Sequence, residues 1–495
     1  MQTLKIPEQP NSEKSYTRAD WQGGYQSLTQ EFDYWIDEIE GEIPLELQGT
    51  LLRNGPGLLD VNGQRLHHPF DGDGMISRIT FTKGRAHFRN SFVKTTGYLE
   101  EKKAGKILYR GVFGTQKPGG WLANAFNFKI KNIANTNVIY WGGKLLALWE
   151  AAEPHRLDPY TLETLGKEYF NGVLSAGEAF SAHPRFDPSC TQDSGEPCLV
   201  NFSIKPGLKT KITIFELNLA GEVVRKHAHS VRGFCFIHDF VITPNYCIFF
   251  QNPVSFNPIP FALGIRSAGE CIKLQSNQPT RIIVIPRQPE TGIQILETQA
   301  GFIFHHVNAF EVGDKVVIDS ICYESLTETE PQSDFRQVDF DALSPGQLWR
   351  FDLNLKENTV QKELIENRCC EFPSIHPDNV GRPYRYLYMG AAHAATGNAP
   401  LQAILKIDLE SGERQLWSAA PRGFVGEPIF VPRPDSQQED NGWVLLLVYD
   451  AVHQRSDVVI LDASDLQKGP VARLHLKHHI PYGLHGNFIS NVFID

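Results

Sequence analysis

Short apolar runs separated by turn residues recur along most of the chain. The runs are rich in β-branched and aromatic residues, a composition that is typical of β-strands. The ten clearest runs lie at residues 137–141, 144–150, 212–219, 222–229, 245–252, 281–287, 315–323, 402–409, 443–450 and 457–463. Glycine-containing pairs separate neighbouring runs and predict hairpin turns at residues 142–143, 220–221 and 411–412.

Helical patterns are few by comparison. One amphipathic stretch covers residues 121–133, and a shorter one precedes Tyr34. Many short strands without a dividing linker favour an all-β propeller over a sandwich or a doubly wound sheet. We therefore expect a single propeller domain at residues 16–495 after a flexible tail at residues 1–15. No blade signature recurs, so the pattern alone does not give the number of blades.

Composition narrows the class of protein. The 495 residues carry 47 Lys and Arg against 57 Asp and Glu, a net charge of −10, which argues against a nucleic-acid partner. The first residues lack a signal-peptide pattern, and no stretch offers 18 consecutive apolar residues for a membrane span. Eight cysteines without a CxxC pair are expected to be buried thiols of a cytoplasmic protein. Nucleotide-binding loops and nucleophile elbows are also missing from the sequence.

Four of the seventeen histidines sit beside strongly apolar or aromatic residues: His183, His238, His305 and His485. A lone histidine of this kind is more often a satisfied core residue than a ligand. Their separations of 55, 67 and 180 residues match one blade, one blade and two to three blades of a propeller. If the inner strand of each blade sends one imidazole to the central axis, the four form a site for a redox metal, and no zinc-finger or HExxH spacing competes.

Three glutamates end apolar segments and suit a supporting role: Glu150, Glu371 and Glu427. Metal-bound imidazoles usually donate their second N–H to a carboxylate or a carbonyl group. For any one of these glutamates, a salt bridge or a solvated strand end explains the position equally well. Together with the four histidines they form a consistent set.

A series of motifs in fixed order resembles the carotenoid cleavage oxygenases, especially the cyanobacterial apocarotenoid oxygenases, from about Tyr16 to Asn487. The motifs are LLRNGPG (51–57), HPFDGDGM (68–75), KNIANTN (131–137), SAHPR, FIHDF, FHHVNAFE, CCEFP, GRPYRYLYMGAAH, GEPIFVPRP and LHG. The resemblance implies a seven-bladed propeller with Fe(II) on its axis under a dome of loops and short helices. It assigns the iron ligands to His183, His238, His305 and His485, with His306 as a neighbour only. The supporting carboxylates fall on Glu150, Glu371 and Glu427, so that His183 has no glutamate partner.

The implied activity is that of a dioxygenase that uses O₂ to split a conjugated C=C bond into two carbonyl groups. The bond expected from the resemblance is the 15,15′ bond of apocarotenals, which gives retinal. Two alternatives stay open: cleavage of full-length bicyclic carotenoids at the 9,10 and 9′,10′ bonds, and a propeller that binds carotenoid or a protein partner without catalysis.

An apolar substrate requires an apolar path to the metal and a way out of the bilayer. The resemblance places tunnel walls at Tyr25, Phe70, Trp149, Phe236, Phe304 and Tyr323, although an aromatic residue of this kind taken alone is more often a core residue than a substrate contact. Two apolar segments, 121–130 and 254–265, are candidates for peripheral membrane contact, and either segment could instead pack on the propeller.

Overall fold

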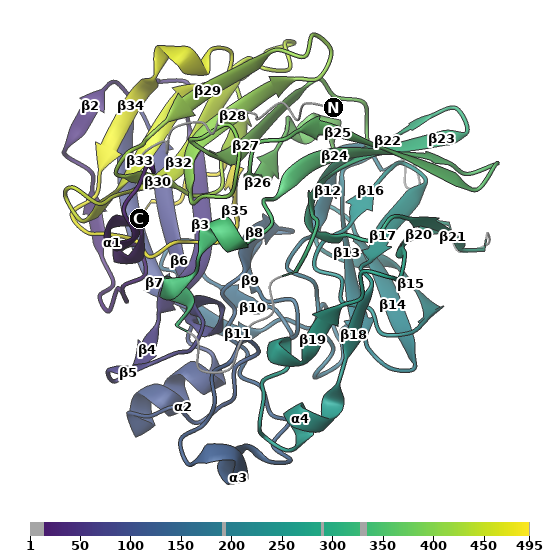
Figure 1. Ribbon diagram of the computed structural model, residues 1–495. Helices are drawn as coiled ribbons and strands as arrows, with labels where there is room; N and C mark the ends of the chain where they lie inside the picture. Colours follow the sequence, from purple (N-terminus) through teal and green to yellow (C-terminus); the bar gives the residue numbers. More distant parts are fainter. Residues whose placement is uncertain (1–13, 191–194, 289–291, 327–333, 495) are drawn as a thin grey trace, which may run out of the picture.

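Seven antiparallel sheets of at least four strands form a ring (Figure 1). The computed structural model describes residues 14–190, 195–288, 292–326 and 334–494. This architecture confirms the predicted all-β, seven-bladed propeller. The blades are numbered here in chain order, and blades 1 and 7 each combine strands from both ends of the chain.

The strands of the seven blades have the following bounds. Blade 1 contains β1 (Asp33–Trp35), β3 (Gly49–Leu58), β6 (Asp73–Thr82), β7 (Arg85–Phe92) and β35 (Gly486–Ile489). Blade 2 contains β8 (Asn137–Trp141), β9 (Lys144–Leu148), β10 (His155–Leu157) and β11 (Thr164–Lys167). Blade 3 contains β12 (Arg185–Asp187), β13 (Cys198–Lys205), β14 (Lys209–Leu217) and β15 (Val223–Arg232). Blade 4 contains β16 (Val241–Ile242), β17 (Tyr246–Gln251), β20 (Thr280–Pro286) and β21 (Gln294–Thr298). Blade 5 contains β22 (Phe302–Val312), β23 (Lys315–Tyr323), β24 (Gln347–Asn354) and β25 (Thr359–Glu366). Blade 6 contains β26 (Cys370–Ser374), β27 (Tyr386–Ala392), β28 (Leu401–Asp408) and β29 (Arg414–Ser418). Blade 7 contains β2 (Ile39–Gly41), β30 (Gly423–Val425), β31 (Ile429–Pro432), β32 (Gly442–Asp450), β33 (Arg455–Asp462) and β34 (Pro470–His475).

Smaller elements connect the strands, and some of them cover one end of the ring. Two ribbons pair β4 (Asp60–Val61) with β5 (Gln64–Arg65) and β18 (Val254–Phe256) with β19 (Ile272–Leu274). The α-helices are α1 (Arg18–Gly23), α2 (Thr96–Ala104), α3 (Gly120–Asn124) and α4 (Pro258–Ala262). Single 3₁₀ turns occur at Pro69–Asp71, Gly269–Cys271, Phe335–Gln337, Phe340–Ala342, Pro377–Asn379 and Leu466–Lys468. In Figure 1, α2, α3 and α4 lie together below the blades, where the dome was expected.

The ring is closed by strands from opposite ends of the chain. In blade 1, β35 pairs with β3 in a register that sets Arg53 opposite Gly486. In blade 7, β2 pairs with β34 in a register that sets Ile39 opposite Leu474. Both closures are antiparallel, and both bring segments more than 430 residues apart into one sheet.

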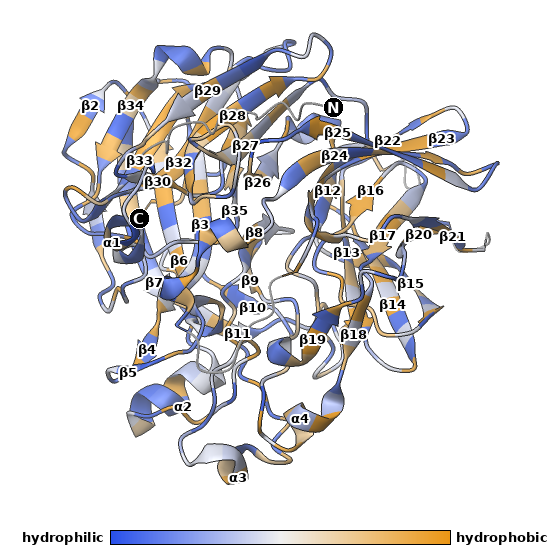
Figure 2. Ribbon diagram, in the orientation of Figure 1, coloured by the Kyte–Doolittle hydropathy of each residue, from blue (hydrophilic) through white to orange (hydrophobic). Residues whose placement is uncertain are grey.

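The apolar core lies between the blades. Seven apolar clusters each combine side chains from two neighbouring blades, and an eighth packs α1 against blade 7. Figure 2 shows hydrophobic residues following the strands of the blades. The predicted hairpin turns at residues 142–143, 220–221 and 411–412 connect β8 to β9, β14 to β15 and β28 to β29.

The prediction of a helix at residues 121–133 is confirmed only for the first residues of this segment and is wrong for the rest. Helix α3 ends at Asn124, whose side chain bonds the carbonyl groups of Lys117 and Gly120. Phe126 then adopts a left-handed backbone with φ of 55° and donates its N–H to the Ala262 carbonyl of α4 at 2.7 Å. Tertiary pairing with α4 therefore replaces the continuation of the helix.

Most of the tail predicted at residues 1–15 lies outside the described residues. The two described positions contact the propeller, since Lys14 pairs with Asp341 and Ser15 bonds Gln402. All eight cysteines are buried thiols. Among the described residues, every helix is too short or too polar to cross a bilayer.

Candidate metal centre

The innermost strands of the blades converge on the axis of the ring. Neighbouring inner strands contact each other, β12 with β16, β16 with β22, and β35 with β8. His183 and His238 lie just before β12 and β16, His485 immediately precedes β35, and His305 belongs to β22. Each of the four histidines thus comes from a different blade, as the spacing predicts.

The four imidazoles meet in one cluster. Their candidate ligand atoms all lie within 4.8 Å of one another. The Nε2 atoms of His183 and His238 are 2.9 Å apart, and the ring centroids of His305 and His485 are 4.8 Å apart. The neighbouring His306 is bonded through Nδ1 to Ser320 Oγ at 2.7 Å and is not part of this cluster.

Each of the three expected glutamates accepts a hydrogen bond from one of these histidines. Glu150 bonds Nδ1 of His238, Glu371 bonds Nδ1 of His305 at 2.5 Å, and Glu427 bonds Nδ1 of His485 at 2.8 Å. These glutamates come from blades 2, 6 and 7, while the histidines come from blades 3, 4, 5 and 1. Every blade therefore contributes one side chain to the centre.

The hydrogen bonds orient three of the imidazoles in a way that suits metal binding. With Nδ1–H donated to a carboxylate, the Nε2 lone pair of each ring is left for another partner. The buried Nε2 atom of His305 has no hydrogen-bond partner. Burial lowers the pKa of His183 well below its usual range, and the adjacent His238 lowers it further. An unpartnered buried nitrogen and a neutral imidazole both suit a divalent cation at the centre of the cluster.

The surroundings of the two buried carboxylates beside the centre favour their charged form. Burial alone would raise the pKa of Glu371, but the adjacent His305 lowers it below the usual value. The pKa of Glu427 is likewise raised by burial and lowered by His485 and Arg53, with a net decrease. These carboxylates are therefore acceptors for the imidazole N–H groups rather than proton donors.

Among the expected tunnel residues, Phe304 lies directly against one of the histidines. The Phe304 ring is 5.7 Å from the His238 ring and 5.8 Å from that of Tyr323. Phe236 is two rings farther out than Phe304, since it contacts Phe302, which contacts Phe304. Trp149 is buried next to Glu150.

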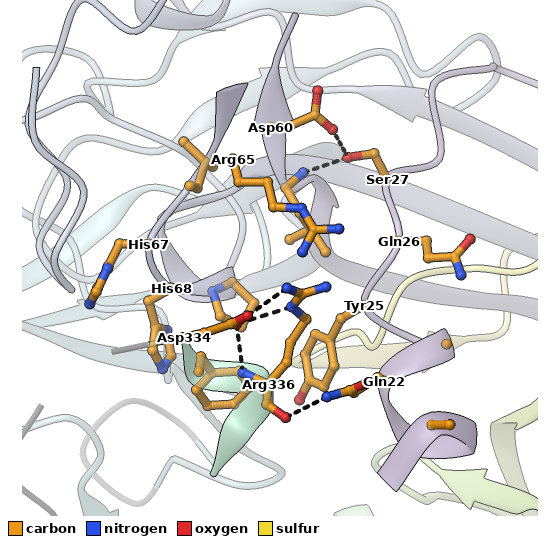
Figure 3. Close-up of a pocket in the computed structure, with 16 residues that line it drawn as sticks. Gln22, Tyr25, Gln26, Ser27, Asp60, Arg65, His67, His68, Asp334 and Arg336 are labelled. Carbon is orange, nitrogen blue, oxygen red and sulfur yellow. Dashed lines mark hydrogen bonds and ion pairs between the residues drawn. The ribbon is translucent and has the colours of Figure 1, made fainter. Parts of the chain in front are cut away.

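Tyr25 and Phe70 lie in the dome rather than against the cluster. Tyr25 contacts Tyr482 at 4.7 Å between ring centroids and lines a pocket of about 490 Å³. Figure 3 shows this pocket, in which Tyr25 lies near Arg336 and Gln22, and His68 lies on the other side. Phe70 packs on His68 and is more than one-third exposed. A role of these two residues in a tunnel remains a prediction.

Phe372 and Arg53 are neighbours of the centre that the sequence reasoning did not single out. Phe372 has a left-handed backbone with φ of 56°, which is uncommon for a bulky residue. Its ring lies 5.5 Å from that of His305 and 5.4 Å from that of His485. Arg53 pairs with Glu427. Both residues belong to recognised motifs, CCEFP and LLRNGPG, which were the available signals.

A second group of potential metal ligands consists of Asp187, Cys190 and Cys198. The positively charged side chain of Arg287 already lies among them. The fully buried Arg287 donates to Asp187 at 2.6 Å and to the two sulfur atoms at 3.2 and 3.4 Å. The guanidinium group occupies the position that a metal would need, so this group is an ion-pair site.

Comparisons with known proteins agree with the geometry. The family described as Retinal pigment epithelial membrane protein matches residues 25–490. The chain is 55% identical to the Apocarotenoid-15,15′-oxygenase of Synechocystis sp., over 97% of this chain and 98% of that protein. It is 31% identical to Lignostilbene-alpha,beta-dioxygenase isozyme III of Sphingomonas paucimobilis, over 91% of this chain and 93% of that protein. The crystal structure of cobalt-substituted Synechocystis ACO superposes with a TM-score of 0.96 at 55% identity, covering 97% of this chain and 100% of that one.

Proposed function

The chain belongs to the carotenoid cleavage oxygenase family, the family described as Retinal pigment epithelial membrane protein, and from this premise we propose an Fe(II)-dependent oxygenase that cleaves the 15,15′ bond of apocarotenals to give retinal. The observation that carries the proposal is the cluster of four histidines with converging ligand atoms, three of them oriented by glutamates. The 55% identity to the Synechocystis enzyme favours its bond over the 9,10 alternative.

The residues of the cluster fit Fe(II). Four neutral imidazoles would hold the metal and leave its double positive charge uncompensated. Iron, when bound, supplies the activation of O₂ that splitting a C=C bond into two carbonyl groups requires. Zinc suits the same donors but has no redox chemistry.

The protein side chains near the centre bind and orient and do not transfer protons. Glu371 and Glu427 already accept hydrogen bonds from imidazoles and carry negative charge, so neither is an acid catalyst. Phe304 and Phe372 place apolar rings against the histidines. These rings exclude water from the centre and offer contact surface to a polyene, which can form few hydrogen bonds.

The test is a product assay with the full chain loaded with Fe(II). We expect retinal from β-apo-8′-carotenal and no product from β-carotene, identified by chromatography and mass. The Zn(II)-loaded protein is the matched control, and it should bind substrate without turnover. Ionone-ended C₁₃ products would indicate the 9,10 activity, and a loaded protein without turnover on either substrate would indicate a carotenoid-binding propeller.

An apolar patch on the dome supports peripheral contact with a membrane. The patch consists of exposed side chains on and around α3 and α4: Trp121, Leu122, Phe126, Phe128, Ile259, Leu263 and Ile265. The buried Arg110 joins the two helices by donating to the carbonyl groups of Asn124, Phe261 and Arg266. The two helices lie close together at the edge of the molecule in Figure 1. A rigid apolar surface of this kind is suited to the lipid interface. Separately, the eight buried thiols suit a protein of the reducing cytoplasm.

Replacing Trp121 and Phe128 of the patch by serine is expected to weaken vesicle binding. Each side chain is more than half exposed, so the fold loses little. Burying one such side chain in the interface contributes about 1.5–3 kcal/mol, so the double variant should lose at least 100-fold in partitioning. Co-sedimentation with phosphatidylcholine vesicles measures this loss. Leu208→Ser is the control, because Leu208 is 97% exposed on blade 3. Equal binding by the wild type and the double variant would contradict the patch.

A further inference from the structure

The three histidine–glutamate pairs of the centre differ in what holds the glutamate. Glu427 also accepts from Arg53 and from the backbone N–H of Gly486 at 3.0 Å. Glu371 also accepts from the Tyr323 hydroxyl at 2.6 Å and from the backbone N–H of Phe372 at 2.8 Å. Glu150 has His238 as its hydrogen-bond partner and is the most exposed of the three, with 25% of its side-chain surface accessible against 13% and 11%.

Arg53 contacts both the glutamate partner of His485 and the backbone next to His485. One guanidinium nitrogen pairs with Glu427, and another donates to the carbonyl oxygen of Leu484 at 2.9 Å. The backbone fits equally tightly, because a Cβ on Gly486 would lie 1.9 Å from the Leu52 carbonyl oxygen. Arg53 therefore fixes the carboxylate that orients the His485 ring and also the backbone residue before it.

Tyr323 acts on the second of these pairs, Glu371 and His305. Its hydroxyl group bonds Glu371 Oε1, while Oε2 of the same carboxylate bonds His305 at 2.5 Å. Two partners on two oxygen atoms leave the carboxylate no freedom to rotate. The Tyr323 ring is itself packed edge-on against Phe304. This chain of contacts transmits the position of β23 to the His305 ring.

We infer that Arg53 and Tyr323 are positioning residues of the metal centre, acting through Glu427 on His485 and through Glu371 on His305. The inference rests on the proposed function in that the four histidines hold a divalent metal. On this inference, the orientations of the His305 and His485 rings are fixed by glutamates that have several partners. The rings of His183 and His238 are held less tightly. Tyr323 thereby has a role at the metal in addition to the tunnel wall.

The experiment measures Co²⁺ binding to the full chain by the visible absorption of the bound metal and by competition with a chelator. Co²⁺ is the probe because it reports ligand geometry, and the Synechocystis relative crystallised with it. Replacing a residue that supports a metal ligand typically lowers the metal affinity about 10–100-fold. We expect about 10-fold weaker binding and a shifted spectrum for Tyr323→Phe, which removes only the hydroxyl group. Arg53→Gln should bind at least as weakly, and Arg53→Lys should restore part of the loss.

Tyr388→Phe is the matched control. Tyr388 is buried and donates its hydroxyl to the Ala463 carbonyl at 2.9 Å, so this variant also loses a buried hydrogen bond but keeps the metal spectrum. Wild-type affinity and an unchanged spectrum in both Tyr323→Phe and Arg53→Lys would overturn the inference while leaving the oxygenase intact. A wild-type chain that binds no Co²⁺ would overturn both the inference and the proposed metal centre. If Arg53→Gln does not fold, Tyr323→Phe and Arg53→Lys decide the outcome.

Discussion

Replacing His238 by alanine is expected to abolish iron binding and oxygenase activity while leaving the propeller folded. His238 supplies one of the four imidazoles, and its removal also leaves Glu150 without its hydrogen-bond partner. Replacing a residue that only supports a metal ligand typically lowers the metal affinity about 10–100-fold. Loss of a direct ligand should have a larger effect, so the iron affinity should decrease by more than about 100-fold. The residue lies in a loop before β16 and belongs to none of the apolar clusters between blades.

Iron content after dialysis, product formation and circular dichroism together check this result. His393→Ala is the control, because His393 is exposed and its imidazole ring bonds the Ser418 hydroxyl, far from the four histidines in the chain. It should retain iron and turnover. A His238→Ala protein with a full iron complement and unimpaired turnover would remove His238 from the ligand set and would leave the metal to the other three histidines.

The sequence was sufficient for the features that depend on local patterns. Runs such as residues 137–141 and 315–323 became β8 and β23 because their β-branched and aromatic composition and the turn residues that flank them are readable within ten positions. The short closing strands β2 and β35 were not predicted. Each has only three or four residues, and each is stabilised by a partner more than 430 positions away. A strand of this length has no signal of its own.

The same distinction applies to the metal centre. The four histidines were recognisable because their apolar surroundings are local and their spacing matches the blades. Arg53 was not, because its pairing with Glu427 spans 374 residues and a single arginine in a strand usually faces solvent. The placement of Tyr25 and Phe70 in the dome likewise depends on how the loops pack over the ring. Local sequence thus predicts which groups can bind a metal, and the closure of the ring determines what supports them.

The second large effect is expected on the free energy of unfolding, when an ion pair between two blades is removed. Arg287 of blade 4 pairs with Asp187 at 2.6 Å and with Glu216 at 2.8 Å, both in blade 3. The three side chains are fully buried. Arg287→Met is expected to destabilise the protein by about 3–5 kcal/mol, because it leaves two buried carboxylates with less compensating charge than they need. Arg382 and Arg225 still pair with Asp187 and Glu216, which favours the lower end of this range.

The measurement is the free energy of unfolding from urea titration of the Arg287→Met variant, with Arg281→Met as the control. Arg281 lies near the start of β20, six positions before Arg287, and pairs with Glu297, but both partners are more than one-third exposed, so its loss should cost less than about 1 kcal/mol. The metal affinity of the folded variant should remain near that of the wild type, because Arg287 has no contact with the four histidines. A loss no larger than that of the control would mean that apolar packing alone holds blades 3 and 4 together. A loss of metal binding at unchanged stability would instead connect this ion-pair site to His183, which lies four positions before Asp187.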